Sequence, residues 1–133
     1  RLKVKYLTKG GSVEYLSYMD LHVFDGPATS FVESMVYNIP SICIWNTEIY
    51  EVKDEHKELF SSLREVGIIC INHKEFVDNA KKFILNKDYW FSSEVQIARN
   101  NFLKDMAFFS DDWKGDLQRA FSLIKDDEIG VNG

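Results

Sequence analysis

The sequence has few of the residues that mark a disulfide scaffold or a metal centre. Only two cysteines occur in 133 residues, and Cys43 and Cys70 each lie inside a short apolar run. No CxxC or His/Cys spacing accompanies them, and His22, His56 and His73 are far apart in the sequence. We therefore expect two buried thiols that behave as small hydrophobic side chains, with no metal site. Free thiols also suit a reducing cytoplasm.

Long apolar runs and excess positive charge are also missing. The longest strongly apolar run, about Ile39–Trp45, is too short to span a bilayer, and no secretory signal is visible. A net charge of −5 argues against non-specific binding to nucleic acid or to anionic membranes. We expect a cytoplasmic protein, at most peripheral at the inner membrane, with no nucleic-acid partner. No Ser-His-Asp order or nucleophile elbow appears, so the sequence assigns no catalytic residue.

What is present is an ordinary globular composition, with 45% hydrophobic and 28% charged residues in a length that fits one domain. The first residue is Arg1, and a strand-like pattern follows at once. We therefore expect the chain to be a piece of a longer protein. Residues 1–125 form the expected domain, and the polar tail 126–133 is expected to be frayed.

Apolar periodicity alternates between period 2 and helical spacing along the chain. It predicts strands at Leu2–Leu7, Leu21–Phe24, Ser41–Trp45 and Ile68–Ile71, and helices at Ser12–Tyr18, Ser30–Tyr37, Asp54–Val66, Lys74–Leu85, 93–108 and 111–125. Strands separated by helices pair in parallel through right-handed crossovers. The predicted fold class is α/β, a three-layer Rossmann-like parallel sheet with extra C-terminal helices.

Turn and cap residues support these boundaries. Thr29 or Ser30 is expected to cap the second helix, and Asn38 to end it in the left-handed conformation, with Pro40 blocking continuation. Gly67 is expected to end the third helix. The fourth helix is expected to turn a set of apolar residues inward: Phe76, Val77, Ala80, Phe83 and Ile84.

The stretch Val23–Trp45, VFDGPATSFVESMVYNIPSICIW, carries the chemistry. A strand ends, a Gly-Pro turn follows, and a helix opens with two hydroxyl residues. Ligands of open α/β sheets sit beyond the carboxyl ends of the strands. A helix N-terminus there suits a phosphate, and the Glu33 carboxylate can accept two hydrogen bonds from a diol such as ribose. Ser/Thr caps and early glutamates also occur in α/β domains without a ligand.

The segment Asp25–Met35, followed by Asn38-Ile39-Pro40 and an apolar strand, resembles the donor-site segment of GT-B glycosyltransferases. The resemblance implies that the turn and the helix N-terminus hold a diphosphate and that Glu33 binds the ribose. Asn46, at the end of the next strand, would touch the sugar or cap the following helix. Ser34 stands where Ala is usual, and Asn38 where Gly is usual. The implied substrate-binding residues are Asp25, Gly26, Pro27, Thr29, Ser30, Glu33 and Asn46.

The resemblance continues downstream, over about Leu2 to Phe121. Trp45-Asn46, Tyr50-Glu51 and Val66-Gly67-Ile68 are similar to a subgroup of transferases of bacterial surface-polysaccharide (LPS, O-antigen or capsule) biosynthesis. So are Arg99-Asn100-Asn101-Phe102 and the pair Ser110 and Trp113. Trp45 itself would either stack on a ligand or pack in the core.

The resemblance implies a nucleotide-diphosphate sugar as donor, with no further cofactor. It also implies that two strands of the donor domain and a whole N-terminal acceptor domain are missing, so the chain alone is expected to be inactive. The sheet would be centred on Ser41–Trp45, and its truncated side would favour a homodimer. Two alternatives remain: a non-catalytic α/β interaction or regulatory module of the flavodoxin-like type, and a nucleotide-sugar epimerase of the GT-B fold.

Overall fold

The computed structural model describes residues 15, 18–107, 112, 114–115 and 118–119 of the chain. Four of the expected elements lie wholly or mostly outside these residues. They are the strand Leu2–Leu7, the helix Ser12–Tyr18, the helix at 111–125 and the tail 126–133. The central elements, which carry the predicted site, are all described.

The described elements follow the expected order. Each predicted strand and helix between residues 21 and 108 is present, with boundaries shifted by a few residues. They are β1 (His22–Phe24), α2 (Thr29–Val36), β2 (Ser41–Ile44), the 3-10 turn η2 (Asp54–His56), α3 (Lys57–Glu65), β3 (Ile69–Cys70), α4 (His73–Leu85), the 3-10 turn η3 (Lys87–Phe91) and α5 (Ser93–Met106).

The three strands form one parallel sheet in the order β1-β2-β3. Val23 pairs with Ile42 on one side of the central strand, and Cys43 pairs with Ile69 on the other. Each pair is joined by a crossover that contains a helix, α2 or α3. The α/β class and the central position of the strand after Pro40 are therefore as the sequence predicts.

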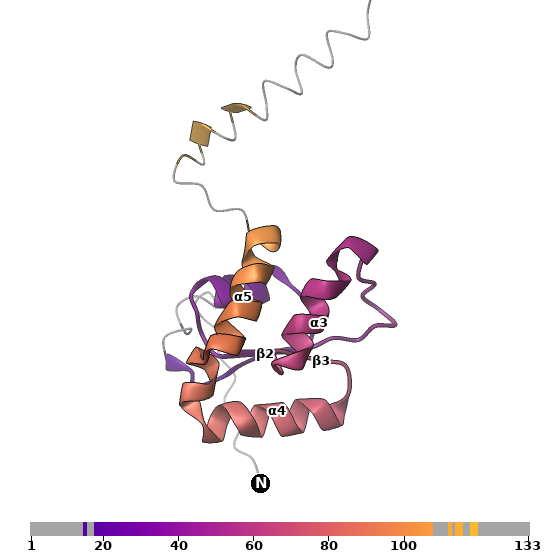
Figure 1. Cartoon of the computed structure of the whole chain (residues 1–133), viewed down its shortest axis with the longest axis vertical. Coiled ribbons are helices and arrows are strands. Elements are labelled where there is room, and N and C mark those ends of the chain that lie inside the picture. The colour runs from indigo at the N-terminus through magenta and orange to yellow at the C-terminus, as the bar shows by residue number, and fades with distance from the viewer. Residues whose placement is uncertain (1–14, 16–17, 108–111, 113, 116–117, 120–133) are drawn as a thin grey trace, which may run out of the picture.

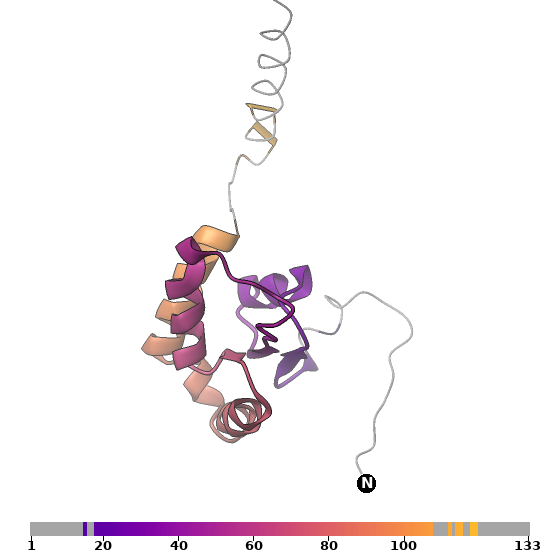
Figure 2. The same cartoon turned by 90° about the vertical axis from the view of Figure 1, so that its right-hand side faces the viewer.

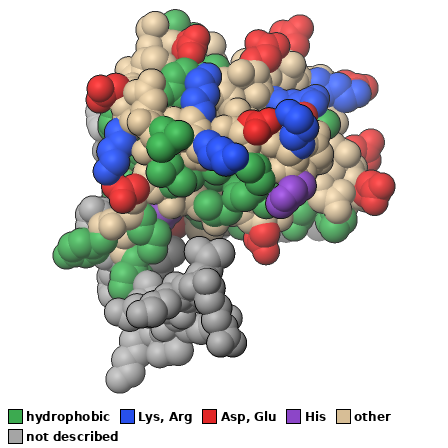
Figure 3. Space-filling view, turned by 90° about the horizontal axis from the view of Figure 1, so that it is seen from below, with side chains coloured by type: hydrophobic (Ala, Val, Ile, Leu, Met, Phe, Trp, Pro, Cys, Tyr) green, Lys and Arg blue, Asp and Glu red, His purple; other side chains and the backbone are tan. Residues whose placement is uncertain are grey.

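Helices cover both faces of this sheet. Helices α3 and α5 stand side by side on one face, with α2 beside α5, while α4 lies across the opposite face (Figure 1). The view turned by 90° shows α4 nearly end-on below the sheet (Figure 2). Seen from below, the surface around α4 mixes acidic and basic side chains with apolar ones, without a large patch of one charge (Figure 3).

The core lies mainly between the sheet and helices α2, α3 and α5. It contains side chains from all three layers, including Phe31, Met35, Cys43, Trp45, Leu63, Ile68, Ile69, Phe83, Trp90, Val95, Ala98, Phe102 and Leu103. Aromatic rings connect these elements, since Phe102 of α5 meets Phe31 in a tilted contact and Phe60 edge to face, with centroids 6.0 and 5.8 Å apart. On α4 the prediction was wrong for Ile84, which is 53% exposed, while Phe83 is buried. Ile84 points outward, although it is next to Phe83, because α4 contacts the sheet along a single stripe of its surface.

The C-terminal end of α2 is held by the polar side chains of distant residues. Asn38 has a φ of 56°, as predicted for a left-handed cap. Its N–H donates to the Met35 carbonyl at 3.2 Å, and the Ile39 N–H donates to the Ser34 carbonyl at 3.0 Å. These two bonds define a Schellman motif. The Asn38 amide oxygen also accepts from the Trp90 indole at 2.9 Å. A glycine would supply the conformation but not this acceptor.

Arg99 of α5 binds the same helix end. It is 8% exposed. Its guanidinium donates to the carbonyls of Met35 and Val36, the latter at 3.1 Å, and to the amide oxygen of Asn100 at 2.9 Å. Burial lowers its pKa. The carbonyl end of a helix carries partial negative charge, so it stabilises a buried cation that has no carboxylate partner among the described residues.

Ser34 is also explained by a long-range partner. Its hydroxyl donates to the Phe31 carbonyl, and the hydroxyl of Ser41 on β2 lies 2.8 Å from it. Both residues are fully buried. A buried hydroxyl needs a partner, so the serine that stands at the usual alanine position is matched by a second serine on the adjacent strand.

Candidate functional site

The turn that follows β1 is tight and its residues lie at the carboxyl edge of the sheet. The N–H of Ala28 donates to the Gly26 carbonyl at 2.9 Å, which closes a three-residue turn centred on Pro27. The fixed φ of proline suits the centre of such a turn. Asp25 is exposed and Gly26 is buried. The turn therefore leads the chain from β1 directly into the N-terminus of α2.

Helix α2 begins without a side-chain cap. Its N-cap is Ala28, with extended backbone and no side-chain hydrogen bond, and Thr29 is the first helical residue. The prediction that Thr29 or Ser30 is the cap was therefore wrong: the Pro27 turn starts the helix one residue early, and the hydroxyls fall inside the first turn. The first N–H groups of a helix have no internal acceptor. Within residues 18–107, no hydrogen bond engages the N–H groups or hydroxyls of Thr29 and Ser30.

Glu33 lies on the same side of α2 as Thr29, four residues further along. It is half-buried. Its backbone carbonyl accepts from the Tyr37 N–H at 3.0 Å, so this part of the helix is regular. The turn and the two hydroxyl residues lie at the N-terminus of α2, and Glu33 follows one helical turn after Thr29.

Asn46 holds its own loop together instead of capping the next helix. Its amide oxygen accepts from the Glu48 N–H at 2.9 Å, and its backbone carbonyl accepts from the N–H of Tyr50, also at 2.9 Å. The following turn, η2, has Lys53 as its N-cap with no side-chain bond. The capping alternative was therefore wrong, because Asx geometry favours a local partner two residues on.

Tyr50 brings this loop against the turn after β1. An ideal Cβ at Gly26 would lie 2.9 Å from the Tyr50 hydroxyl oxygen, so a larger residue at position 26 would require the Tyr50 ring to shift. The Tyr50 carbonyl accepts from the Trp45 indole N–H at 2.9 Å. Trp45 is 6% exposed and packs with Phe60 at a centroid distance of 4.5 Å. Trp45 thus belongs to the core, and Tyr50 connects the ends of β1 and β2 at the candidate site.

Sequence reasoning missed a cavity at the same edge of the sheet. It has a volume of about 290 Å³ and lies between the loop after β2, helix α3 and the end of β3. Its lining is Trp45, Thr47, Val52, Lys57, Phe60, Ser61, Arg64, Ile69 and Ile71. Lys57, Phe60, Ser61 and Arg64 follow the spacing i, i+3, i+4, i+7, which places them on one helix face. This helical stripe of basic, aromatic and hydroxyl side chains was the sequence signal that could have predicted the cavity.

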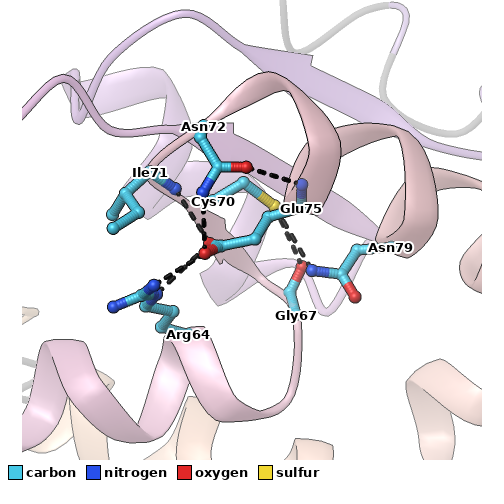
Figure 4. Close-up of polar contacts among 7 residues, drawn as sticks. All are labelled: Arg64, Gly67, Cys70, Ile71, Asn72, Glu75 and Asn79. Carbon is cyan, nitrogen blue, oxygen red and sulfur yellow. Dashed lines mark hydrogen bonds and ion pairs between the residues drawn. The ribbon is translucent and has the colours of Figure 1, made fainter.

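The ion pair between Arg64 and Glu75 separates this cavity from a second, polar hollow. The second hollow is about 390 Å³ and is lined by Ser61, Arg64, Glu65, Glu75 and Asn79. Glu75 is also part of a capping box, because its N–H donates to the side-chain oxygen of Asn72, the N-cap of α4 (Figure 4). Its carboxylate accepts from the Ile71 N–H and from the Asn72 amide.

The two buried thiols of the described residues are poor nucleophiles, because burial disfavours the thiolate. Burial raises the pKa of Cys43 to about 12 and also raises that of Cys70. The two thiols point to opposite faces of the sheet, because Cys43 pairs with Ile69 and Cys70 pairs with Ile44. Burial lowers the pKa of His22. No group of three or more His, Cys, Asp or Glu in the described part of the chain is arranged to hold a metal ion.

No α-helix among the described residues is long and apolar enough to cross a membrane. Comparison with curated proteins and with solved structures gave no match. Comparison with protein-family models matched residues 13–121 to the model described as LIC12162 family transferase. The match includes every described strand and helix, with the turn at Asp25–Ala28 and the cavity. On the extent of that match, the chain belongs to the LIC12162 family of transferases.

Proposed function

We propose that this chain is the nucleotide-sugar-binding part of a GT-B glycosyltransferase that acts in bacterial surface-polysaccharide biosynthesis. The observation that carries the proposal is the strand–turn–helix unit at Asp25–Glu33. It leaves the first N–H groups of α2 without acceptors beyond the carboxyl end of a parallel strand. Membership of a transferase family and the sequence resemblance to GT-B donor sites both support it.

The geometry suggests a division of roles within the site. The diphosphate would sit on the free N–H groups and hydroxyls of Thr29 and Ser30, where the helix dipole favours negative charge. Glu33 would accept from the two ribose hydroxyls. Asp25, Gly26 and Pro27 form the turn that aims this helix end. Asn46 would reach the sugar with its amide nitrogen, because its oxygen is already bonded to the Glu48 N–H.

The rest of the enzyme would lie outside this chain. In the GT-B arrangement a separate N-terminal domain binds the acceptor and, in inverting enzymes, usually supplies the general base, and residues 1–125 would be part of the donor domain. We infer that the chain alone binds donor without transferring sugar. It would work in the cytoplasm, at most peripherally at the inner membrane, and its truncated sheet would favour pairing with a second copy.

The direct test is a titration of the ¹⁵N-labelled chain with UDP-, GDP- and CMP-sugars, followed by NMR. One of these donors is expected to shift the amide signals of Thr29, Ser30 and Glu33. Glu33→Ala is expected to weaken binding about tenfold, since it removes two hydrogen bonds worth about 1–2 kcal/mol together. Glu94→Ala, an exposed acid in the first turn of α5, is the matched control and should leave binding unchanged.

The same experiment separates the alternatives. If no nucleotide sugar perturbs Ser30 or Glu33, the donor-site proposal is wrong and a non-catalytic interaction module is favoured. If donors bind and the isolated chain converts one nucleotide sugar into its epimer, the epimerase alternative is favoured. Robust glycosyl transfer by the isolated chain would contradict the inference that it lacks the catalytic groups.

A further inference from the structure

The cavity between the loop after β2, α3 and β3 contains none of the residues that the proposed donor site uses. Tyr50 contacts the donor-site turn at Gly26, whereas Trp45 lines the cavity. The Trp45 and Tyr50 rings meet edge to face at 6.0 Å. The cavity is therefore separate from the proposed donor site, although both lie at the same edge of the sheet.

One wall of the cavity is apolar and aromatic. It is formed by Trp45, Val52, Phe60, Ile69 and Ile71. The Trp45 indole N–H is already bonded to the Tyr50 carbonyl, so this residue offers only its ring surface. Ile69 is 3% exposed and Ile71 is 40% exposed, so the wall runs from the core to the surface. Such a wall favours the ring or hydrocarbon part of a ligand.

The stripe of α3 that contributes Phe60 to the cavity also carries two basic side chains. Lys57 and Arg64 lie two helical turns apart, and Ser61 lies between them. Lys57 pairs with Asp54, whose side chain is 92% exposed, and an ion pair in water holds little free energy. Lys57 can therefore move from Asp54 to a ligand at small cost.

Arg64 is held in place by Glu75 (Figure 4). Its Nε and Nη2 donate to the Glu75 carboxylate at 3.2 and 2.6 Å. The carboxylate is fixed in turn by the Ile71 N–H at 3.1 Å and the Asn72 amide at 2.9 Å. The remaining nitrogen, Nη1, has no acceptor among the described residues, and Figure 4 shows it pointing away from Glu75. A donor held in this way loses little conformational entropy on binding.

From this arrangement we propose that the cavity binds a small organic anion that carries one apolar ring. The ring lies against Trp45, Phe60 and Val52, and the anionic group lies between Arg64 and Lys57. Glu75 and Asp54 are the acids that face these cations, and they reduce the attraction without occupying Nη1 of Arg64. The volume of about 290 Å³ is at the lower end of ligand-site sizes and fits a single ring with its anionic group. The site is independent of the donor site proposed above.

Phenyl phosphate is a suitable probe because it joins one ring to one anion. Titrated into the ¹⁵N-labelled chain, it should shift the Trp45 indole, Arg64 Nε and Ile71 amide signals in a saturable way. Benzyl alcohol, which has the ring alone, and inorganic phosphate, which has the anion alone, should each bind at least tenfold more weakly. Equal affinity for all three probes, or shifts centred on residues 25–33, would overturn the proposal.

Two variants complete the test. Ser61→Phe fills the cavity from an exposed helix position and should abolish the phenyl phosphate shifts, with an unchanged NMR fingerprint elsewhere. Lys57→Gln should weaken phenyl phosphate about threefold or more and leave benzyl alcohol unchanged. Lys74→Gln, which removes an exposed and paired lysine on α4, is the control. Phenyl phosphate binding that survives Ser61→Phe at full strength would place the ligand elsewhere and contradict the proposal.

Discussion

Helices α2 and α4 both begin at the carboxyl edge of the sheet, after β1 and after β3, but their N-termini differ. The N-terminus of α4 is filled by the chain itself, because Asn72 and Glu75 form a capping box and Arg64 binds the same carboxylate. The N-terminus of α2 has alanine at the cap and no side-chain bond. A capped end contributes stability, whereas an uncapped end leaves donors available for an anion. The comparison indicates a structural role for the N-terminus of α4, and it is consistent with the binding role proposed above for α2.

The opposite end of α2 shows that the open N-terminus is not a sign of a loosely held helix. There, Asn38, Trp90, Gln96 and Arg99 supply polar contacts around the last carbonyls. Each of these contacts joins residues more than fifty positions apart in the sequence. The helix is fixed at one end and open at the other, which suits a rigid binding element.

The largest expected effect tests the C-terminal end of α2, which Arg99 binds. Arg99→Met removes the guanidinium, so the Val36 carbonyl loses its donor and the Met35 carbonyl keeps only its bond from the Asn38 N–H. The free energy of unfolding should fall by about 2–4 kcal/mol, measured by urea titration. Lys104→Met, an exposed residue later in α5, should change it by less than about 0.5 kcal/mol. Equal values for the two variants would show that α2 is not held through Arg99.

The second largest expected effect tests the capped N-terminus of α4. Glu75→Ala should lower the free energy of unfolding by about 1–2 kcal/mol, because it removes the cap partner of Asn72 and the acceptor of Arg64 and Ile71. Asp78→Ala removes an acid from the same helix that only pairs with exposed Lys74, so it should cost less than about 0.5 kcal/mol. Equal losses of unfolding free energy in Glu75→Ala and Asp78→Ala would contradict the structural role of the α4 N-terminus.

The open N-terminus can be closed by design. Ala28→Asp should stabilise the chain by about 0.5–1 kcal/mol, because aspartate is a favoured cap and suits the helix dipole. If α2 binds a diphosphate, the same substitution should weaken nucleotide-sugar binding at least tenfold by repulsion. Ala28→Asn, a neutral cap, should give the stability gain with a smaller loss of binding. A gain in stability with no loss of binding would break the proposed link between the open end and the donor.

The smallest effect is a pH dependence. The hydrogen bond from Arg64 lowers the pKa of Glu75 below its ordinary value of 4.5. A carboxyl whose pKa is lowered by folding stabilises the fold above its unfolded pKa and loses that contribution as the pH falls towards the folded pKa. The advantage of the wild type over Glu75→Gln should therefore be constant at neutral pH. It should shrink by about 1 kcal/mol or less below about pH 4.5. Parallel stability curves for the two proteins down to pH 3 would contradict this assignment.

Local signals in the sequence were enough to predict much of this architecture. The left-handed Asn38 and most helix boundaries depend on residues close in sequence, whereas the expected centre of the sheet came from the family resemblance. Two cap predictions were wrong: the cap of α2 at Thr29 or Ser30, and the capping role of Asn46. In each case several nearby residues could have made the hydrogen bond, and the choice depends on how tightly the turn closes. The outward position of Ile84 depends on the line along which α4 meets the sheet.

Other features were beyond sequence reasoning because they join distant residues. The Arg99 contacts with α2 and the Trp90 bond to Asn38 link α5 and η3 to a helix far earlier in the chain. The cavity is likewise built from three separate segments. For the candidate site, the strand–turn–helix order of residues 25–33 could be predicted from the sequence, whereas the placement of Tyr50 against Gly26 could not.

The contact between Gly26 and Tyr50 has a spectroscopic consequence. An aromatic ring that lies close to a glycine shifts the α-proton resonances of that glycine through its ring current. The two Gly26 α-protons should therefore resonate away from random-coil positions and separately from each other. Any ligand or substitution that lifts the loop from the turn would return these signals towards ordinary values. One glycine thus supplies an internal reporter of whether the loop between β2 and α3 lies open or closed over the end of β1.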